Sequence, residues 1–339
     1  MRVLPSLVAF ALVLANSAAH AEFAPPPLPD GAGKPVKPPP SEDGPPWPQP
    51  PDTRLVANHL LALRYNPLGL EYQLRAGIQK RLYRSNSAAL RDNFVFGGLA
   101  PRLNPAFIKM GPSFEIQPAS FFNLRAAGEV IGFFSTFGFL QSFTSPLADY
   151  SDSTLTDRKD AKLNYSTWGG HAMIEPSVQF RVGNIVVRDK LAVEYWRMSV
   201  NEGDRLFYDV TLDTLISRDG WVISNDADLL YLHDFKDWTG TFRGARFTFG
   251  ARYTMVKPLY QDKDFAPGDS KASVDNEHHR VGPLAAFTFF DHGFEAFNRP
   301  SVILIANWYV DHRFRTGQDV NTAIPYVVLA FAAQSDFWR

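Results

Sequence analysis

The histidines are the first place to look for chemistry in a chain with eight histidines and no cysteine. The absence of cysteine excludes disulfides, thiolate zinc sites and thiol catalysis. Asp311 and His312 are neighbours, and neighbouring side chains on a strand point to opposite faces, so they are not expected to form a catalytic dyad. The run NEHHR offers three metal-ligating side chains but no spaced further ligand, so we predict solvated loop residues there: Glu277, His278 and His279.

A second group of side chains that could do chemistry is acidic. Two adjacent predicted strands each place two aspartates on one face: Asp209 and Asp213 on 205–216, Asp226 and Asp228 on 220–232. The SRDG turn between these strands predicts a hairpin, in which two of the carboxylates lie directly opposite each other and repel. Compensating positive charges are expected on the two flanking strands: Arg188, Lys190, Arg246 and Arg252.

The elements that position these charges are strands, because apolar and polar residues alternate with a period of two along most of the chain. In 70–83 and again around residue 175, one face is apolar and the other carries charges: Glu71, Arg75, Arg81, Glu175 and Arg181. The remaining predicted strands lie near 92–100, 105–117, 121–132, 185–198, 205–216, 220–232, 245–256, 280–290, 301–314 and 323–338.

These strands predict an all-β fold, a transmembrane antiparallel up-and-down β-barrel of about twelve strands. The chain has no apolar run of 18 residues after its N-terminal segment, and segments of about ten residues match strands that cross a bilayer. A soluble β-sandwich is the alternative, but the strands are long and their apolar faces are rich in aromatic residues. The segments 58–66 and 133–143 are further candidates, and both together would raise the count to fourteen.

Two long inserts, 143–166 and 258–279, conflict with this set of strands. Five predicted strands separate them, which places them on opposite sides of the membrane. Long loops of such barrels are expected on the extracellular side. Either one strand is misassigned, therefore, or one long loop is periplasmic.

The N-terminus predicts export. Arg2, an apolar stretch and the sequence Ala19-His20-Ala21 are typical of a signal peptide cleaved after residue 21. Residues 22–54 are rich in proline, which favours an extended periplasmic linker, with a partner in the periplasm or cell wall as the sharper hypothesis. The barrel is then expected over 55–339.

The end of the chain resembles that of bacterial outer-membrane β-barrel proteins. Val327, Leu329, Phe331, Ala333 and Phe337 continue one apolar face of the last strand, although Arg339 departs from the aromatic final residue of that class. The resemblance implies outer-membrane lipid as the surroundings and the barrel-assembly machinery as a partner during biogenesis. It names an architecture and no specific family.

The expected function follows from the inward charges. We predict a narrow pore or transport-associated barrel with a charge-braced lumen, and no cofactor or metal. The alternatives are a non-conducting structural or assembly barrel, and a lipid-modifying or proteolytic enzyme of the outer membrane. His171 shares a polar strand face, where a hydrogen-bonded interior histidine is expected rather than a catalytic one. A net charge of −1 and the lack of a basic run give no reason to expect nucleic acid as a partner.

Overall fold

The computed structural model describes residues 51–236 and 238–338. The predicted signal peptide at 1–21 lies outside the described residues, and so does most of the predicted linker at 22–54. The first element of the described part is a wall strand that begins at Thr53.

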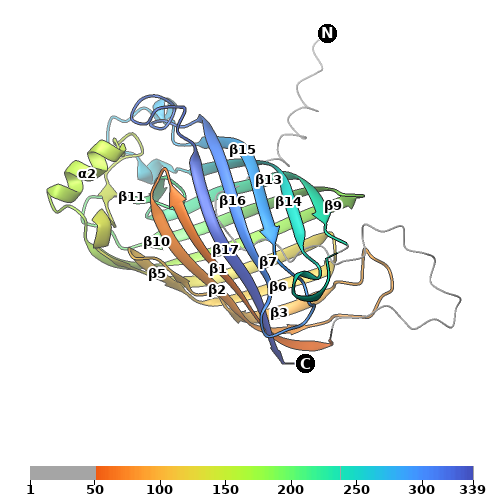
Figure 1. The fold of residues 1–339 in the computed structure, drawn as a ribbon. Coiled ribbons are helices and arrows are strands. Elements are labelled where there is room, and N and C mark those ends of the chain that lie inside the picture. Colours follow the sequence, from red (N-terminus) through yellow and green to blue (C-terminus); the bar gives the residue numbers. More distant parts are fainter. Residues whose placement is uncertain (1–50, 237, 339) are drawn as a thin grey trace, which may run out of the picture.

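The described residues form one closed antiparallel barrel, in which each wall strand pairs with the wall strands before and after it (Figure 1). The last strand pairs with the first, so the wall has no free edge. The prediction of an up-and-down barrel of twelve strands is confirmed. In chain order the wall consists of β1 (Thr53–Tyr65), β2 (Gly69–Lys80), β3 (Phe94–Leu99), β4 (Arg102–Leu103), β5 (Phe107–Met110), β6 (Pro112–Ala119), β7 (Phe122–Phe134), β9 (Ser166–Val182), β10 (Ile185–Met198), β13 (Asp219–Asp234), β14 (Arg246–Leu259), β15 (His278–Thr288), β16 (Asn298–Asp311) and β17 (Tyr326–Trp338).

Two of the twelve strands carry two labels because each is interrupted once. Strands β3 and β4 both pair with β2, and β5 and β6 both pair with β7. Pro101 lies at the first interruption and has no N–H to donate to the ladder. Gly111 lies at the second, where a Cβ atom would be 1.8 Å from the carbonyl oxygen of Gly128. Proline thus accounts for the first interruption, and close approach to β7 requires glycine at the second.

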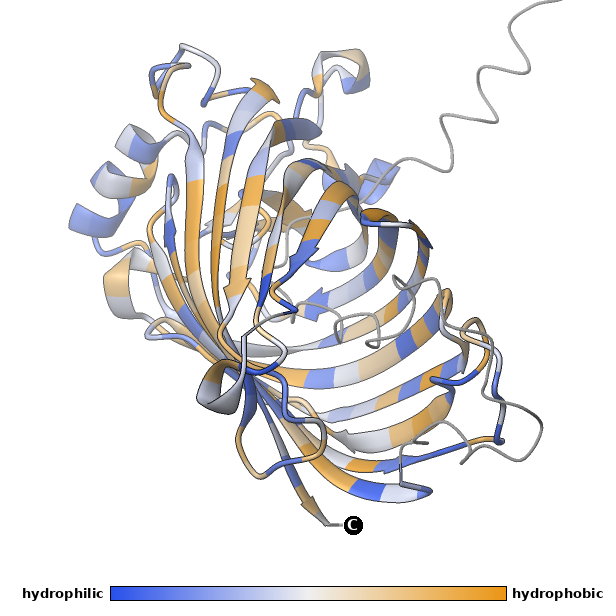
Figure 2. Cartoon of the chain, turned by 45° about the vertical axis from the view of Figure 1, so that its right-hand side comes forward, coloured by the Kyte–Doolittle hydropathy of each residue, from blue (hydrophilic) through white to orange (hydrophobic). Residues whose placement is uncertain are grey.

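Side chains alternate between the lumen and the outer surface along the wall, and Figure 2 shows this as alternating hydropathy. On the outside, large apolar side chains such as Val187, Phe249 and Leu329 are half exposed. On the inside, charged side chains such as Glu129 and Asp228 are buried. An apolar belt around a closed barrel is suited to lipid, so the barrel is a transmembrane one.

The helical elements lie in the connections between strands. They are η1 (Thr136–Gly138), α2 (Asp152–Asp160), η2 (Gly240–Phe242), η3 (Asp262–Asp264) and η4 (Lys271–Ser273). Within the described residues, no helix has the length and apolarity that a membrane crossing would need.

The count of twelve is right, but one member of the predicted set is wrong. The segment 205–216 is not a wall strand, and β10 pairs directly with β13. The further candidate 58–66 takes its place as part of β1, whereas 133–143 holds the end of β7, a 3-10 turn and the short strand β8 (Ser142–Phe143), which is not part of the wall. Alternation shows only that the two faces of a segment differ. It does not show that either face meets lipid.

This correction also resolves the position of the long inserts. Only four wall strands, β9, β10, β13 and β14, separate 143–166 from 258–279, so both emerge at the same end of the barrel. We call this end the loop mouth, and it carries four long connections: 135–165, 199–218, 260–277 and 312–325. We call the opposite end, where β1 begins and β17 ends, the terminal mouth.

Candidate functional site

A hairpin from the connection between β10 and β13 fills the loop mouth. It consists of β11 (Leu206–Asp209) and β12 (Thr214–Ser217), and β8 (Ser142–Phe143) pairs with β11 to make a three-stranded sheet. All twelve residues of this hairpin, 206–217, are buried. We call it the plug hairpin.

The plug hairpin contacts inward-facing side chains from several parts of the wall. Arg64 on β1 donates from Nη1 to the carbonyl oxygen of Val210 at 3.3 Å, and His278 Nε2 on β15 lies 2.8 Å from the carbonyl oxygen of Leu212. Its apolar side chains share a buried cluster with wall residues from five further strands, β5, β7, β10, β13 and β14: Phe107, Phe133, Trp196, Val222 and Val256. The hairpin is therefore seated inside the barrel and does not merely lie over it.

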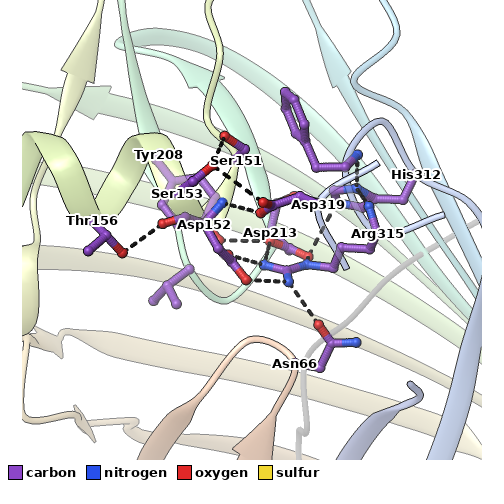
Figure 3. A network of polar contacts seen from close by, with 12 residues as sticks. Asn66, Ser151, Asp152, Ser153, Thr156, Tyr208, Asp213, His312, Arg315 and Asp319 are labelled. Atoms are coloured by element: carbon purple, nitrogen blue, oxygen red, sulfur yellow. Dashed lines mark hydrogen bonds and ion pairs between the residues drawn. The ribbon is translucent and has the colours of Figure 1, made fainter. Parts of the chain in front are cut away.

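A cluster of buried polar side chains holds the turn of the plug hairpin (Figure 3). Asp213 has a positive φ of 53°, which places its carboxylate among donors from separate segments. Tyr208 Oη donates to Asp213 Oδ1 at 2.7 Å, and Tyr309 Oη on β16 donates to Oδ2 at 2.8 Å. Arg315, from the connection between β16 and β17, donates from Nη2 to Oδ1 at 3.0 Å and also from Nε to Oδ2.

Arg315 joins the plug hairpin to two other parts of the loop mouth. Its Nη1 and Nη2 each lie 3.0 Å from a carboxylate oxygen of Asp152, at the start of α2. Its Nη1 also donates to Asn66 Oδ1, in the β1–β2 turn, at 2.8 Å. We call the residues that meet here the Asp213 cluster: Asn66, Asp152, Tyr208, Asp213, Tyr309, His312 and Arg315.

One guanidinium, that of Arg315, serves two carboxylates in the Asp213 cluster, Asp152 and Asp213. Burial alone would raise the pKa of Asp213, but the guanidinium of Arg315 and the ring of His312 outweigh it and hold that pKa well below its ordinary value of 3.8. His312 Nδ1 accepts the backbone N–H of Phe314 at 3.0 Å and of Arg315 at 3.2 Å, so the ring proton sits on Nε2. Nε2 then donates to the carbonyl oxygen of Asp213 at 3.1 Å.

Below the plug hairpin, opposite charges face each other across the strands of the lumen. Arg188 lies directly opposite Asp228, and Lys190 directly opposite Asp226. Arg252 on β14 contacts both aspartates, at 2.7 Å from Asp228 and 3.1 Å from Asp226. The predicted hairpin with two facing carboxylates is wrong, because its first strand belongs to the plug hairpin and leaves β10 free to pair with β13.

The structure places the other predicted site residues as follows. Lys190 also reaches Glu175 at 3.5 Å, Arg75 pairs with Glu115, and Glu71 accepts from Gln73 at 2.6 Å. Three arginines lie near the terminal mouth: Arg81 beside Asp52, and Arg181 and Arg246 beside Asp234. Asp209 and Asp213 lie in the plug hairpin, away from the other predicted carboxylates.

His171 is an interior histidine between two carboxylates. Its Nδ1 lies 2.9 Å from Glu129 and its Nε2 lies 2.9 Å from Glu194, and all three side chains are fully buried. The hydroxyl of Ser224 donates to the same Glu194 at 3.0 Å. The ring packs against Trp196, 4.4 Å between centroids, at the edge of the apolar cluster around the plug hairpin.

The interpretation of NEHHR as solvated loop residues is wrong for His278. Its side chain points into the lumen and is 1% exposed, whereas His279 points outward and lies 2.6 Å from the hydroxyl of Tyr253. The two histidines diverge because they are neighbours on β15. No group of three or more potential metal ligands occurs within the part of the chain that the structure describes.

Sequence reasoning misses the residues that hold the plug hairpin. Arg315 and Asp152 lie in connections with no periodicity, so no pattern marks them. Arg64 and Arg280 do carry a signal, because both occupy the inward parity of predicted strands. The segment 58–66, which contains Arg64, is only a further candidate beyond the twelve predicted strands, so the prediction does not assign the charge of Arg64 to the lumen.

Comparison with known proteins finds similarity only to solved barrel structures. No family model and no curated protein matches it. Among solved structures, OccAB1 of Acinetobacter baumannii is 10% identical with a TM-score of 0.35, and the alignment covers 78% of this chain and 57% of OccAB1. LpxR from Salmonella typhimurium is 9% identical with a TM-score of 0.36, covering 83% of this chain and 100% of LpxR. OmpT of Vibrio cholerae, described as an outer membrane protein, is 8% identical with a TM-score of 0.28, covering 84% and 98%.

The chain thus spans little more than half the length of OccAB1. The resemblance to outer-membrane barrels is confirmed for the architecture, and no specific family is identified. At identities of 8–10%, a role has to be argued from the chain's own residues.

Proposed function

We propose that this chain is an outer-membrane barrel that forms a narrow pore, closed at its loop mouth by the plug hairpin. The observation that carries the proposal is the complete burial of 206–217 against side chains from the inside of the wall. Connections that only covered the outside of a barrel would not need inward-facing partners on β1, β15 and β16. The loop mouth is the extracellular end, since long loops of such barrels lie outside and both ends of the wall lie at the other mouth.

The lumen below the plug hairpin supports passage of small polar solutes. Side chains of Arg188, Lys190 and Arg252 keep 11–18% of their surface exposed. Acidic and basic groups alternate along this wall. They produce an electric field across the lumen and do not select solutes of one charge sign. Since most other inward side chains are buried, a path through the lumen is narrow and its conductance low.

Excising the plug hairpin tests the proposal. The backbone N–H of Arg218 donates to the carbonyl oxygen of Arg205 at 2.8 Å, so two glycines can replace 206–217 without moving the ends. In planar bilayers we expect the intact protein to be closed for most of the time and the excised variant to conduct. Heat-modifiable migration on a gel shows whether the variant still forms a barrel. A folded variant that never conducts refutes the pore.

A non-conducting structural barrel is the second candidate, and the buried ion pairs of the lumen favour it. Pairs such as Arg75 with Glu115 fill space that a solute would need. Silence of a folded excised variant would support this role, in which the loop mouth and the Pro-rich arm contact partners. We propose no catalytic step, because both ring nitrogens of His171 are taken by carboxylates. We propose export through a cleaved signal peptide and contact with outer-membrane lipid for both candidate functions, the pore and the structural barrel.

A further inference from the structure

Two arginines in the lumen beneath the plug hairpin have N–H groups without acceptors. Arg280 on β15 is 1% exposed, and neither its Nε nor its Nη1 has a hydrogen-bond partner. Arg64 on β1 is 3% exposed, and its Nη2 has none. Within the described residues, neither arginine has a carboxylate within ion-pair distance, and Arg64 is influenced by Glu71 and Asp209 only from farther away. A buried charge without a partner is costly, so such groups point to a bound ion.

Tyr326 on β17 brings the two guanidinium groups into one region of the lumen. Cζ of Arg280 lies 4.0 Å from the centroid of the Tyr326 ring and 5.5 Å from that of Tyr309. Arg64 also interacts with the side chain of Tyr326. The four strands involved, β15, β16, β17 and β1, are consecutive in the wall. Both arginines therefore interact with one aromatic side chain, on a continuous part of the wall.

The region is also shaped around Arg64. A Cβ atom at Gly69, on the neighbouring strand β2, would lie 2.7 Å from Arg64 Nη2 and 3.0 Å from its Nε. The missing side chain at Gly69 leaves the space that the guanidinium occupies. The plug hairpin closes the region from above through the contact of Arg64 with Val210, and the hydroxyl of Thr211 there also has no partner.

The paired arginines of the same lumen give the contrast. Arg188 and Arg252 both bind Asp228, and Arg252 binds Asp226 as well, so their charges are matched within the chain. Arg280 instead presents free donors in a fixed planar arrangement, which is the geometry that carboxylates and phosphates accept. Only a group with negative charge would satisfy these donors and offset the charge.

We infer that Arg280 and Arg64 bind an anionic group, a carboxylate or a phosphate, in the lumen directly beneath the plug hairpin. The hydroxyl of Thr211 is placed to donate a further hydrogen bond to it. This site belongs to the closed barrel, so it does not depend on whether the hairpin moves or on whether the barrel conducts. The site would bind small anions, whereas the paired positive and negative charges elsewhere in the lumen do not favour ligands of either sign.

Calorimetric titration of the folded full-length protein in detergent tests the inference, with inorganic phosphate and acetate as separate probes. We expect saturable binding of at least one anion to the wild type, and the anion that binds identifies the group. Arg280→Gln should weaken binding about 10- to 100-fold, because it removes a charged donor pair. Arg246→Gln is the matched control, since it removes the same charge near the terminal mouth and should leave binding unchanged.

A second readout keeps the test decisive if Arg280→Gln folds poorly. The anion should raise the unfolding temperature of the wild type in proportion to its occupancy, and Arg64→Gln, on a different strand, should reduce that increase. Equal affinities of the wild type and Arg280→Gln would overturn the inference. Failure of both anions to bind the wild type would overturn it as well, whatever bilayer recording shows.

Discussion

Replacing Asp213 with asparagine should loosen the plug hairpin without opening the wall. The change keeps the size of the side chain but removes the charge that Arg315, Tyr208 and Tyr309 contact. Removing one partner of a buried ion pair costs about 3–5 kcal/mol. Arg315 keeps its two contacts with Asp152, so the lower end, about 3 kcal/mol, applies. At 1.4 kcal/mol per factor of ten, the opening equilibrium of the hairpin rises about 100-fold.

Hydrogen exchange read by mass spectrometry measures this equilibrium. The backbone N–H of Tyr208 donates to the carbonyl oxygen of Gln141 at 3.0 Å, and that bond has to break when the hairpin leaves the mouth. Protection of 206–217 should fall about 100-fold in Asp213→Asn, while protection of the wall strands stays the same. Asp219→Asn is the control, because its pair with Lys263 is half exposed and should contribute roughly 0–1 kcal/mol.

The pH dependence of the same protection provides an independent check. The pKa of Asp213 is depressed in the folded state, so its stabilising effect is complete above the ordinary value of 3.8 and is lost as the pH falls below it. Protection should therefore be constant at neutral and mildly acidic pH and decline below about pH 4, and Asp213→Asn should lack this decline. Unchanged protection in Asp213→Asn, with the barrel intact, would refute the role assigned to Arg315.

Two further predictions concern the wall. Gly69→Ala should displace Arg64 and lower the free energy of unfolding by about 1–3 kcal/mol, measured by thermal unfolding. Gly97→Ala is the control and should be neutral, because a Cβ atom there meets nothing within 4 Å. Equal unfolding midpoints of the two variants would contradict the packing argument. His171→Gln removes the ring that bridges the buried carboxylates of Glu129 and Glu194. Because Glu129 keeps Arg102 at 3.5 Å, the cost should lie at the lower end of the range for a broken buried pair, about 3 kcal/mol in urea unfolding. His233→Gln is the control, because the side chain of His233 is exposed. If His171→Gln unfolds at the same urea concentration as the wild type, the carboxylates have found other partners and the prediction is wrong.

The wall could be predicted from the sequence because lipid and lumen impose a period of two on every strand. Arg188 and Asp228 are assigned to polar faces by parity alone, and the structure places both on the inside. Parity does not predict the surroundings of 205–216, because both faces of this segment contact protein. Asp209 and Asp213 share one parity in this segment, but their carboxylates accept hydrogen bonds within the plug hairpin. Their spacing therefore does not reflect a strand that crosses the membrane.

The residues around the plug hairpin were harder to predict for a different reason. Arg315 reaches Asp213 across 102 positions of sequence and Asn66 across 249, and no local pattern reports contacts of that separation. His278 looked like a solvated residue because it follows a long polar connection, yet it is the first residue of β15 and points inward. Loops that fold back into a barrel are invisible to any argument based on strand periodicity.

The pairing of β1 with β17 has a consequence for how the chain acquires its fold. The paired residues Leu63 and Leu329 are separated by almost the whole described chain, so this seam is the most expensive contact to close in chain entropy. Until it closes, the sheet has two open edges with unpaired N–H and C=O groups, which are prone to pair with other chains. The slow step of assembly should therefore be the zipping of this seam, and a catalyst of folding would act there by shielding or templating one of the two edges.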